Sequence, residues 1–144
     1  MSVETPTASR VPSVLFICVS NRGKSVMAQG LAQKIAGATL SAGSAGTEAT
    51  VDGRVNELSA QALAEVGVGV SDHRPRQLTD DMMRAADVTV VVGSAARVKP
   101  PEGTTLEVWD TDEPSLRGIE GIERMRLIRD DIATRVTDLI ARLT

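Results

Sequence analysis

The residue best placed for chemistry is the single cysteine, Cys18, which ends an unbroken apolar run that begins at Val14. Such a run is typical of a strand buried on both faces in a parallel sheet. A turn of small and polar residues follows, and a helical pattern starts at Ser25. We expect backbone N–H groups of this turn, and the positive end of the helix, to stabilise a thiolate and bind a tetrahedral oxyanion.

The neighbours of Cys18 favour a reactive thiol. A thiolate nucleophile needs positive charge and hydrogen-bond donors nearby. Lys24 would supply the charge and Ser25 a hydroxyl group, while Asn21 tolerates the left-handed backbone that would turn the amides of the loop inward. A cysteine at the end of a core strand is more often an inert packing residue, but the polar, cationic turn reverses that expectation here.

An acidic segment from Asp110 to Pro114 is the second candidate for chemistry. A leaving group that departs from a thiol-bound intermediate needs a proton, so a carboxylic acid should face the cysteine loop. Asp112 and Glu113 are the candidates, and the sequence does not choose between them. Without the cysteine nearby, the segment would be interpreted as an acidic surface turn.

The other polar candidates carry less weight. His73 is the only histidine, and no cluster of metal-ligand residue types accompanies it, so we expect a structural loop residue and no metal site. Arg74 and Arg76 are interpreted as solvated loop charges, and Trp109 as a core residue.

Composition indicates one globular domain. The chain has 144 residues, 42% of them hydrophobic and 24% charged, which suits a single soluble core. The net charge of −3 gives no reason to expect nucleic acid or a membrane as partner. One cysteine excludes an internal disulfide and suits a reducing cytoplasm. We expect a flexible leader over residues 1–12 and one domain over residues 13–144.

Strands alternate with helices along the chain, which predicts an α/β fold with a parallel sheet and helices on both sides. The expected strands cover residues 14–18, 39–42, 87–92 and 106–109. The expected helices cover residues 25–36, 55–66, 80–83 and 122–143, with a single helical turn at residues 94–97. The charged face of the last helix is expected to be solvated. In such sheets, sites form beyond the carboxyl ends of the strands.

Several motifs keep their order and spacing along the chain. They are VLFICVSNRGKS at residues 14–25, SAGT at 44–47, AEVGV at 64–68, SDH at 71–73, ADVTVVVG at 86–93, WDTDEP at 109–114 and IRDDI at 128–132. Over roughly residues 13–143, the sequence therefore resembles the low-molecular-weight protein tyrosine phosphatase superfamily and, within it, the arsenate reductases.

The resemblance implies a three-layer sandwich with a central four-stranded parallel sheet. It implies Cys18 as nucleophile and Ser25 as the residue that stabilises the thiolate. The Asp-Pro general acid of the family aligns with Glu113-Pro114, and Asp112 lies one residue earlier. The implied site for an arsenate or phosphate oxyanion is the loop of Val19, Ser20, Asn21, Arg22, Gly23, Lys24 and Ser25.

The sequence departs from the family pattern in two ways. Lys24 stands where family loops usually have arginine, and lysine cannot hold two oxygens in a planar fork. The chain also lacks the further cysteines through which thioredoxin-coupled members relay oxidation. The remaining scheme is that of the mycothiol-dependent members, in which a low-mass thiol attacks the arsenic and a separate redoxin, mycoredoxin- or glutaredoxin-like, completes the reduction.

The sequence therefore predicts a cytoplasmic arsenate reductase with a role in arsenical resistance, which joins arsenate to mycothiol or another low-mass thiol and has no tightly bound cofactor. Two alternatives stay open. One is a phosphatase acting on small phosphoesters or phosphotyrosine, although the chain has no tyrosine of its own to line an aromatic pocket. The other is a non-catalytic oxyanion-binding protein.

Overall fold

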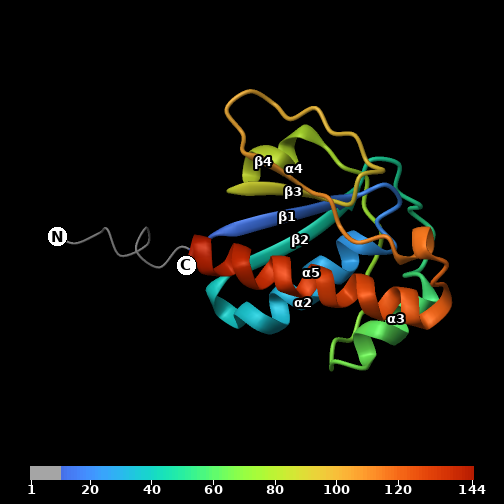
Figure 1. Cartoon of the computed structure of the whole chain (residues 1–144). Helices are drawn as coiled ribbons and strands as arrows, with labels where there is room; N and C mark the ends of the chain where they lie inside the picture. The colour runs from blue at the N-terminus through green and yellow to red at the C-terminus, as the bar shows by residue number, and fades with distance from the viewer. Residues whose placement is uncertain (1–10) are drawn as a thin grey trace.

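Four parallel strands form the centre of the computed structural model, which describes residues 11–144 (Figure 1). The strands are β1 (Ser13–Cys18), β2 (Ser41–Gly46), β3 (Val88–Val92) and β4 (Leu106–Trp109). They are ordered β2-β1-β3-β4, so the strand that ends in the cysteine is central. Most of the expected leader, residues 1–10, lies outside the described residues.

Helices lie on both faces of this sheet, which confirms the three-layer sandwich. Helices α2 (Lys24–Ala36) and α5 (Gly121–Leu143) cover one face, with α3 (Glu57–Ala64) beside α5, and α4 (Asp80–Ala85) lies on the other face (Figure 1). Two 3-10 turns, η1 (Gly37–Thr39) and η2 (Pro114–Arg117), complete the elements. None of the helices between residues 11 and 144 has the length and apolar character needed to cross a bilayer.

The apolar run of β1 is explained by burial on both faces. Phe16 packs into the larger core beneath α2 and α5, whereas Ile17 packs into a smaller core beneath α4. The Phe16 ring tilts against Trp109 with ring centroids 5.8 Å apart, so the two aromatic residues of the chain join β1 to β4. Alternation along a strand places successive side chains on opposite faces, so the buried positions 14–18 are apolar on both faces.

Two local expectations were wrong. The second strand, expected over residues 39–42, begins at Ser41 and continues through Gly46, so the small residues after position 42 belong to the sheet. At Gly46 a small residue is required, because a Cβ atom there would lie 2.5 Å from the Val19 carbonyl oxygen of the cysteine loop. Residues 94–97 form no helical turn: a bend covers residues 93–95, and residues 96 and 97 are irregular. They follow Gly93, whose φ of 96° turns the chain out of β3.

The last helix was predicted correctly, but its charged face is not wholly solvated. The Arg129 side chain is only 11% exposed and donates to the carbonyl oxygen of Ala62 and to Glu65. Asp131 accepts a hydrogen bond from the backbone N–H of Asp112 at 2.7 Å. The helix therefore anchors both α3 and the acidic loop. By contrast, the apolar side chain of Ile35 in α2 is 45% exposed.

Replacing Ile132 by alanine should lower the free energy of unfolding by about 2–5 kcal/mol, because this fully buried side chain would leave a cavity beneath the sheet. Ile35→Ala removes the same atoms from an exposed helix position and should change the free energy of unfolding by about 1 kcal/mol or less. Urea denaturation of both variants measures the difference. Equal losses would mean that the core is placed wrongly.

Candidate active site

The candidate site is built on the loop of residues 19–23, which joins the carboxyl end of β1 to the start of α2. Cys18 ends the strand with 9% of its surface exposed and pairs in register with Gly46 of β2. This is the edge of a parallel sheet at which ligands bind. The strand–loop–helix order follows from the sequence, because the apolar run stops where the small and polar residues begin.

Three buried polar side chains connect the loop to the Cys18 sulfur. The Asn21 amide donates to Ser25 Oγ at 2.8 Å and to Ser44 Oγ at 3.0 Å. Ser25 Oγ in turn lies 2.9 Å from Cys18 Sγ. Because Ser25 Oγ already accepts from Asn21, its own hydrogen is available to point at the sulfur. The serine hydroxyl is thus arranged to stabilise a negative charge on Cys18.

Asn21 is held in a left-handed conformation, with φ of 59°, as its residue type allowed. Its side-chain Oδ1 accepts from the backbone N–H of Arg76 at 2.9 Å, and its backbone carbonyl is 2.9 Å from His73 Nε2. A carbonyl oxygen can only accept, so His73 carries a hydrogen on Nε2. His73 thus binds the backbone of the cysteine loop.

The carbonyl groups of the loop are bound on the side of β2 and the segment that follows it. Cys18, Val19 and Ser20 accept backbone hydrogen bonds of 2.8–3.1 Å from Thr47, Glu48 and Thr50. Between residues 11 and 144, no hydrogen bond is donated by the backbone N–H groups of Ser20, Asn21, Arg22 and Gly23. Several adjacent N–H groups are therefore available to an oxyanion.

Lys24 extends from the first residue of α2 toward the acidic loop. Its Nζ lies 3.6 Å from Glu113 Oε1, and its side chain crosses Gly93 at the end of β3. A Cβ atom added at Gly93 would lie 3.1 Å from this nitrogen, so the glycine leaves room for the lysine. The point charge expected at this position is thus paired with one of the two predicted acids.

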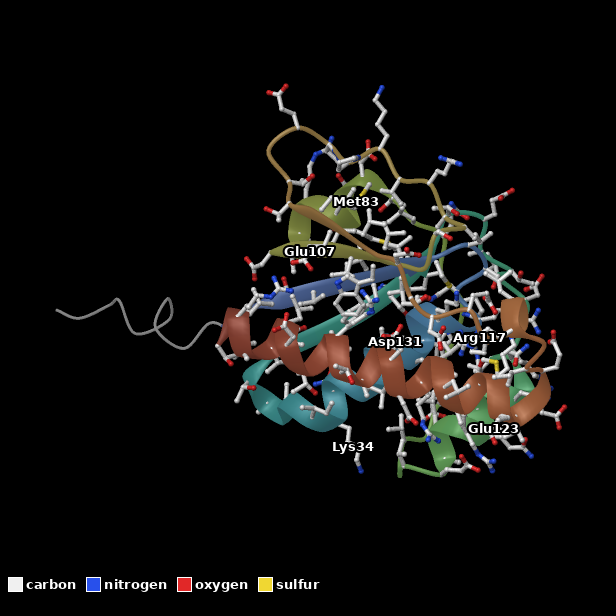
Figure 2. The ribbon with its side chains drawn as sticks, in the orientation of Figure 1. Lys34, Met83, Glu107, Arg117, Glu123 and Asp131 are labelled. Atoms are coloured by element: carbon white, nitrogen blue, oxygen red, sulfur yellow. The ribbon has the colours of Figure 1, made fainter. Side chains whose placement is uncertain are left out.

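Both predicted acids lie at the acidic loop, and both are ion-paired. Arg124 donates to Glu113 through Nε at 2.9 Å and Nη2 at 3.1 Å, and these bonds hold the pKa of Glu113 at about 2. Arg117 and Asp131, labelled in Figure 2, approach Asp112 from η2 and α5. The hydrogen bond from Arg117 lowers the pKa of Asp112 below its usual value. At neutral pH, both groups are carboxylates in this arrangement.

Several contributors were not found from the sequence. The Ser44 hydroxyl accepts a hydrogen bond from the Asn21 amide and donates one to Gln29 Oε1 at 2.5 Å. The Arg76 guanidinium, expected to be solvated, instead donates to the Ser44 carbonyl at 3.1 and 3.2 Å. Arg124, on the face of the last helix that was expected to be solvated, instead donates to Glu113. These contacts join residues distant in sequence, although the SAGT motif at residues 44–47 already marked the Ser44 segment.

Comparison with known proteins agrees with this geometry. The profile of the family described as low molecular weight phosphotyrosine protein phosphatase matches residues 13–144. The chain belongs to this family. Arsenate reductase 1 of Staphylococcus epidermidis is 29% identical over 134 residues, which cover 91% of this chain and 97% of that protein.

Solved structures give the same result. A thioredoxin-dependent arsenate reductase of Corynebacterium glutamicum superposes with a TM-score of 0.75 at 32% identity. The match covers 97% of this chain but only 65% of the Corynebacterium protein, so the chain spans about two thirds of the length of that protein. An arsenate reductase in its phosphate-binding state superposes with a TM-score of 0.77 at 25% identity, over 93% of this chain and all of that one.

Replacing Gly46 by alanine should weaken phosphate binding by tenfold or more, with the protein still folded. The new Cβ would lie 2.5 Å from the Val19 carbonyl and 2.9 Å from the Asn21 nitrogen, so the loop backbone must shift. Gly69→Ala is the matched control, because nothing lies within 4 Å of its Cβ position. Isothermal titration calorimetry with inorganic phosphate compares the two variants. Unchanged affinity in Gly46→Ala would show that this loop does not bind the anion.

Stability should depend on the charge of Glu113. Its pKa in the folded protein, about 2, lies below the ordinary 4.5, so the carboxylate stabilises the fold above about pH 4.5. This contribution is lost as the pH falls toward 2. Between pH 6 and pH 3, wild type should therefore lose more unfolding free energy than Glu113→Gln. Urea denaturation measures this, with Glu102→Gln in an exposed turn as control. Parallel losses in wild type and Glu113→Gln would contradict the ion pair.

Proposed function

We propose that this protein is an arsenate reductase-like enzyme that attaches arsenate to Cys18 and passes it to a low-mass thiol. The observation that carries the proposal is the hydrogen-bonded chain from Asn21 through Ser25 to the sulfur, beside the unbonded N–H groups of the loop. These hydrogen bonds orient the Ser25 hydroxyl toward a Cys18 thiolate. The backbone N–H groups of the loop can donate to the oxyanion that this thiolate attacks.

The first step forms a sulfur–arsenic bond without an oxidation. The Cys18 thiolate attacks dihydrogen arsenate, an As–O bond breaks, and the departing oxygen leaves as water with both arsenate protons. The products are Cys18–S–AsO₃²⁻ and H₂O, so charge and hydrogen balance and arsenic stays pentavalent. The backbone N–H groups and the Lys24 ammonium would bind the three remaining oxygens.

The second stage needs thiols from outside this sequence, because Cys18 is its only cysteine. A low-mass thiol attacks the arsenic, releases the Cys18 thiolate and loses its proton to water. A thiol of a redoxin then attacks the sulfur of the released thiol–arsenate adduct. A disulfide forms, the S–As bond breaks, and arsenic takes the two electrons of that bond to become arsenite, which takes up the proton of the redoxin thiol. We propose mycothiol as the low-mass thiol and a mycoredoxin- or glutaredoxin-like protein as the redoxin, in the cytoplasm.

Phosphatase activity is a second candidate, supported by membership in a phosphatase family and by the same loop. It would require a protonated acid opposite the thiolate. Glu113 and Asp112 are both held as carboxylates by arginines. The geometry therefore supports arsenate more strongly than an ester.

In a coupled assay with arsenate, mycothiol and mycoredoxin, wild type should turn over arsenate, and Cys18→Ser should show no turnover above background. Ser25→Ala should lower the rate on the order of 10²-fold because it removes the donor beside the sulfur. Ser94→Ala, in an exposed bend, is the matched control.

The outcomes separate the candidates. Turnover with glutathione but not with mycothiol would identify glutathione as the low-mass thiol and would leave the cysteine mechanism unchanged. Hydrolysis of an aryl phosphate without arsenate turnover would establish the phosphatase. Phosphate binding without either reaction would establish a non-catalytic oxyanion-binding protein, and equal rates for wild type and Cys18→Ser would exclude the cysteine mechanism.

A further inference from the structure

We infer that Arg124 is a specificity-determining residue, which disfavours phosphate monoesters by preventing Glu113 from donating a proton. The inference rests on the proposed function, because it explains why a phosphatase-like loop would process arsenate rather than esters. Arg124 is a positioning residue, since its side chain donates to Glu113 and Met125 and not to the cysteine loop.

The hydrogen bonds and ion pairs of Glu113 disfavour protonation of its carboxylate. Arg124 holds both carboxylate oxygens, and the Ser115 hydroxyl donates to Oε2 at 2.8 Å. Lys24 Nζ adds an ion pair at Oε1. A proton on either oxygen would displace or weaken a charge-assisted bond. The side chains of Glu113 and Arg124 are about 30% exposed, so water screens the bidentate pair only in part.

The cations around Glu113 act in the same direction. Lys24 faces it from α2 and Arg124 from the first turn of α5. Asp112, its neighbour in the chain, is also an anion, but it is ion-paired with Arg117 at 2.8 Å. Glu120 lies close enough to Arg124 to help keep that guanidinium charged. Two cations from two helices therefore favour the Glu113 carboxylate.

The two substrates differ in their need for this proton. When the Cys18 thiolate attacks a monoester dianion, the P–O bond breaks and an alkoxide or phenoxide leaves, which needs a proton from an acid. Dihydrogen arsenate brings the two protons with which its oxygen leaves as water. An enzyme whose acid is held ionised thus loses ester hydrolysis and keeps the arsenate step.

Arg124→Gln tests the inference, with phenyl phosphate as a substrate whose leaving group needs protonation. At pH 5, a pKa of about 2 leaves about one Glu113 in a thousand protonated, and a pKa near 4.5 would leave about a quarter. Hydrolysis at pH 5 should therefore rise at least tenfold, and the variant's rate should level off below about pH 4.5, where the wild-type rate still rises. The arsenate rate should change by less than threefold.

Two further variants locate the effect. Arg117→Gln releases Asp112 instead and is the matched control, for which we expect a phenyl phosphate rate within twofold of wild type. In Glu113→Gln/Arg124→Gln, the gain should disappear because the donor is absent. A gain that persists in the double variant, or that appears with Arg117→Gln, would overturn the inference, as would an unchanged rate and pH profile in Arg124→Gln.

A measurement on wild type keeps the inference testable if Arg124→Gln does not fold. Carbon-detected NMR of the Glu113 carboxyl group should show titration below pH 3, and titration above pH 4 would overturn the inference. The experiments distinguish a failure of the proposed arsenate function from a failure of the role inferred for Arg124. If wild type does not turn over arsenate but Arg124→Gln gains ester hydrolysis, the arsenate function fails and the role of Arg124 stands.

Discussion

The site depends on one buried side chain, the amide of Asn21. Its nitrogen donates to two serine hydroxyls and its oxygen accepts from the backbone of Arg76, so it joins the cysteine loop to β2 and to the segment that follows α3. A fully buried amide must satisfy its donors and acceptor, because leaving one unbonded costs about 1–3 kcal/mol. The left-handed turn at Asn21 and the orientation of Ser25 are fixed by the same contacts.

The rest of the fold holds this amide in place. Burial of β1 on both faces fixes the position of Cys18, and small residues at the end of β2 let the loop lie against that strand. Helix α5 contributes more than apolar packing, since Arg124 and Asp131 fix the acidic loop beside the carboxyl ends of the strands. The two halves of the site then meet where Lys24 pairs with Glu113.

The sequence predicted the features that depend on neighbouring residues. The apolar run before Cys18, the polar turn after it and the six-turn periodicity of α5 each lie within one segment, so their pattern is visible without the fold. The limits of β2 were missed because small residues resemble a turn unless the adjacent loop is known. The contacts of Arg76 and Arg124 were missed because a solvated and an ion-paired arginine have the same sequence pattern.

The most direct measurement is the rate at which iodoacetamide alkylates Cys18 at pH 6, followed by mass spectrometry with and without arsenate. If the loop holds a thiolate next to an oxyanion site, Cys18 should react at least tenfold faster than free cysteine, and saturating arsenate or phosphate should abolish the difference. A thiol that reacts no faster than free cysteine, or one that arsenate does not protect, would contradict the account.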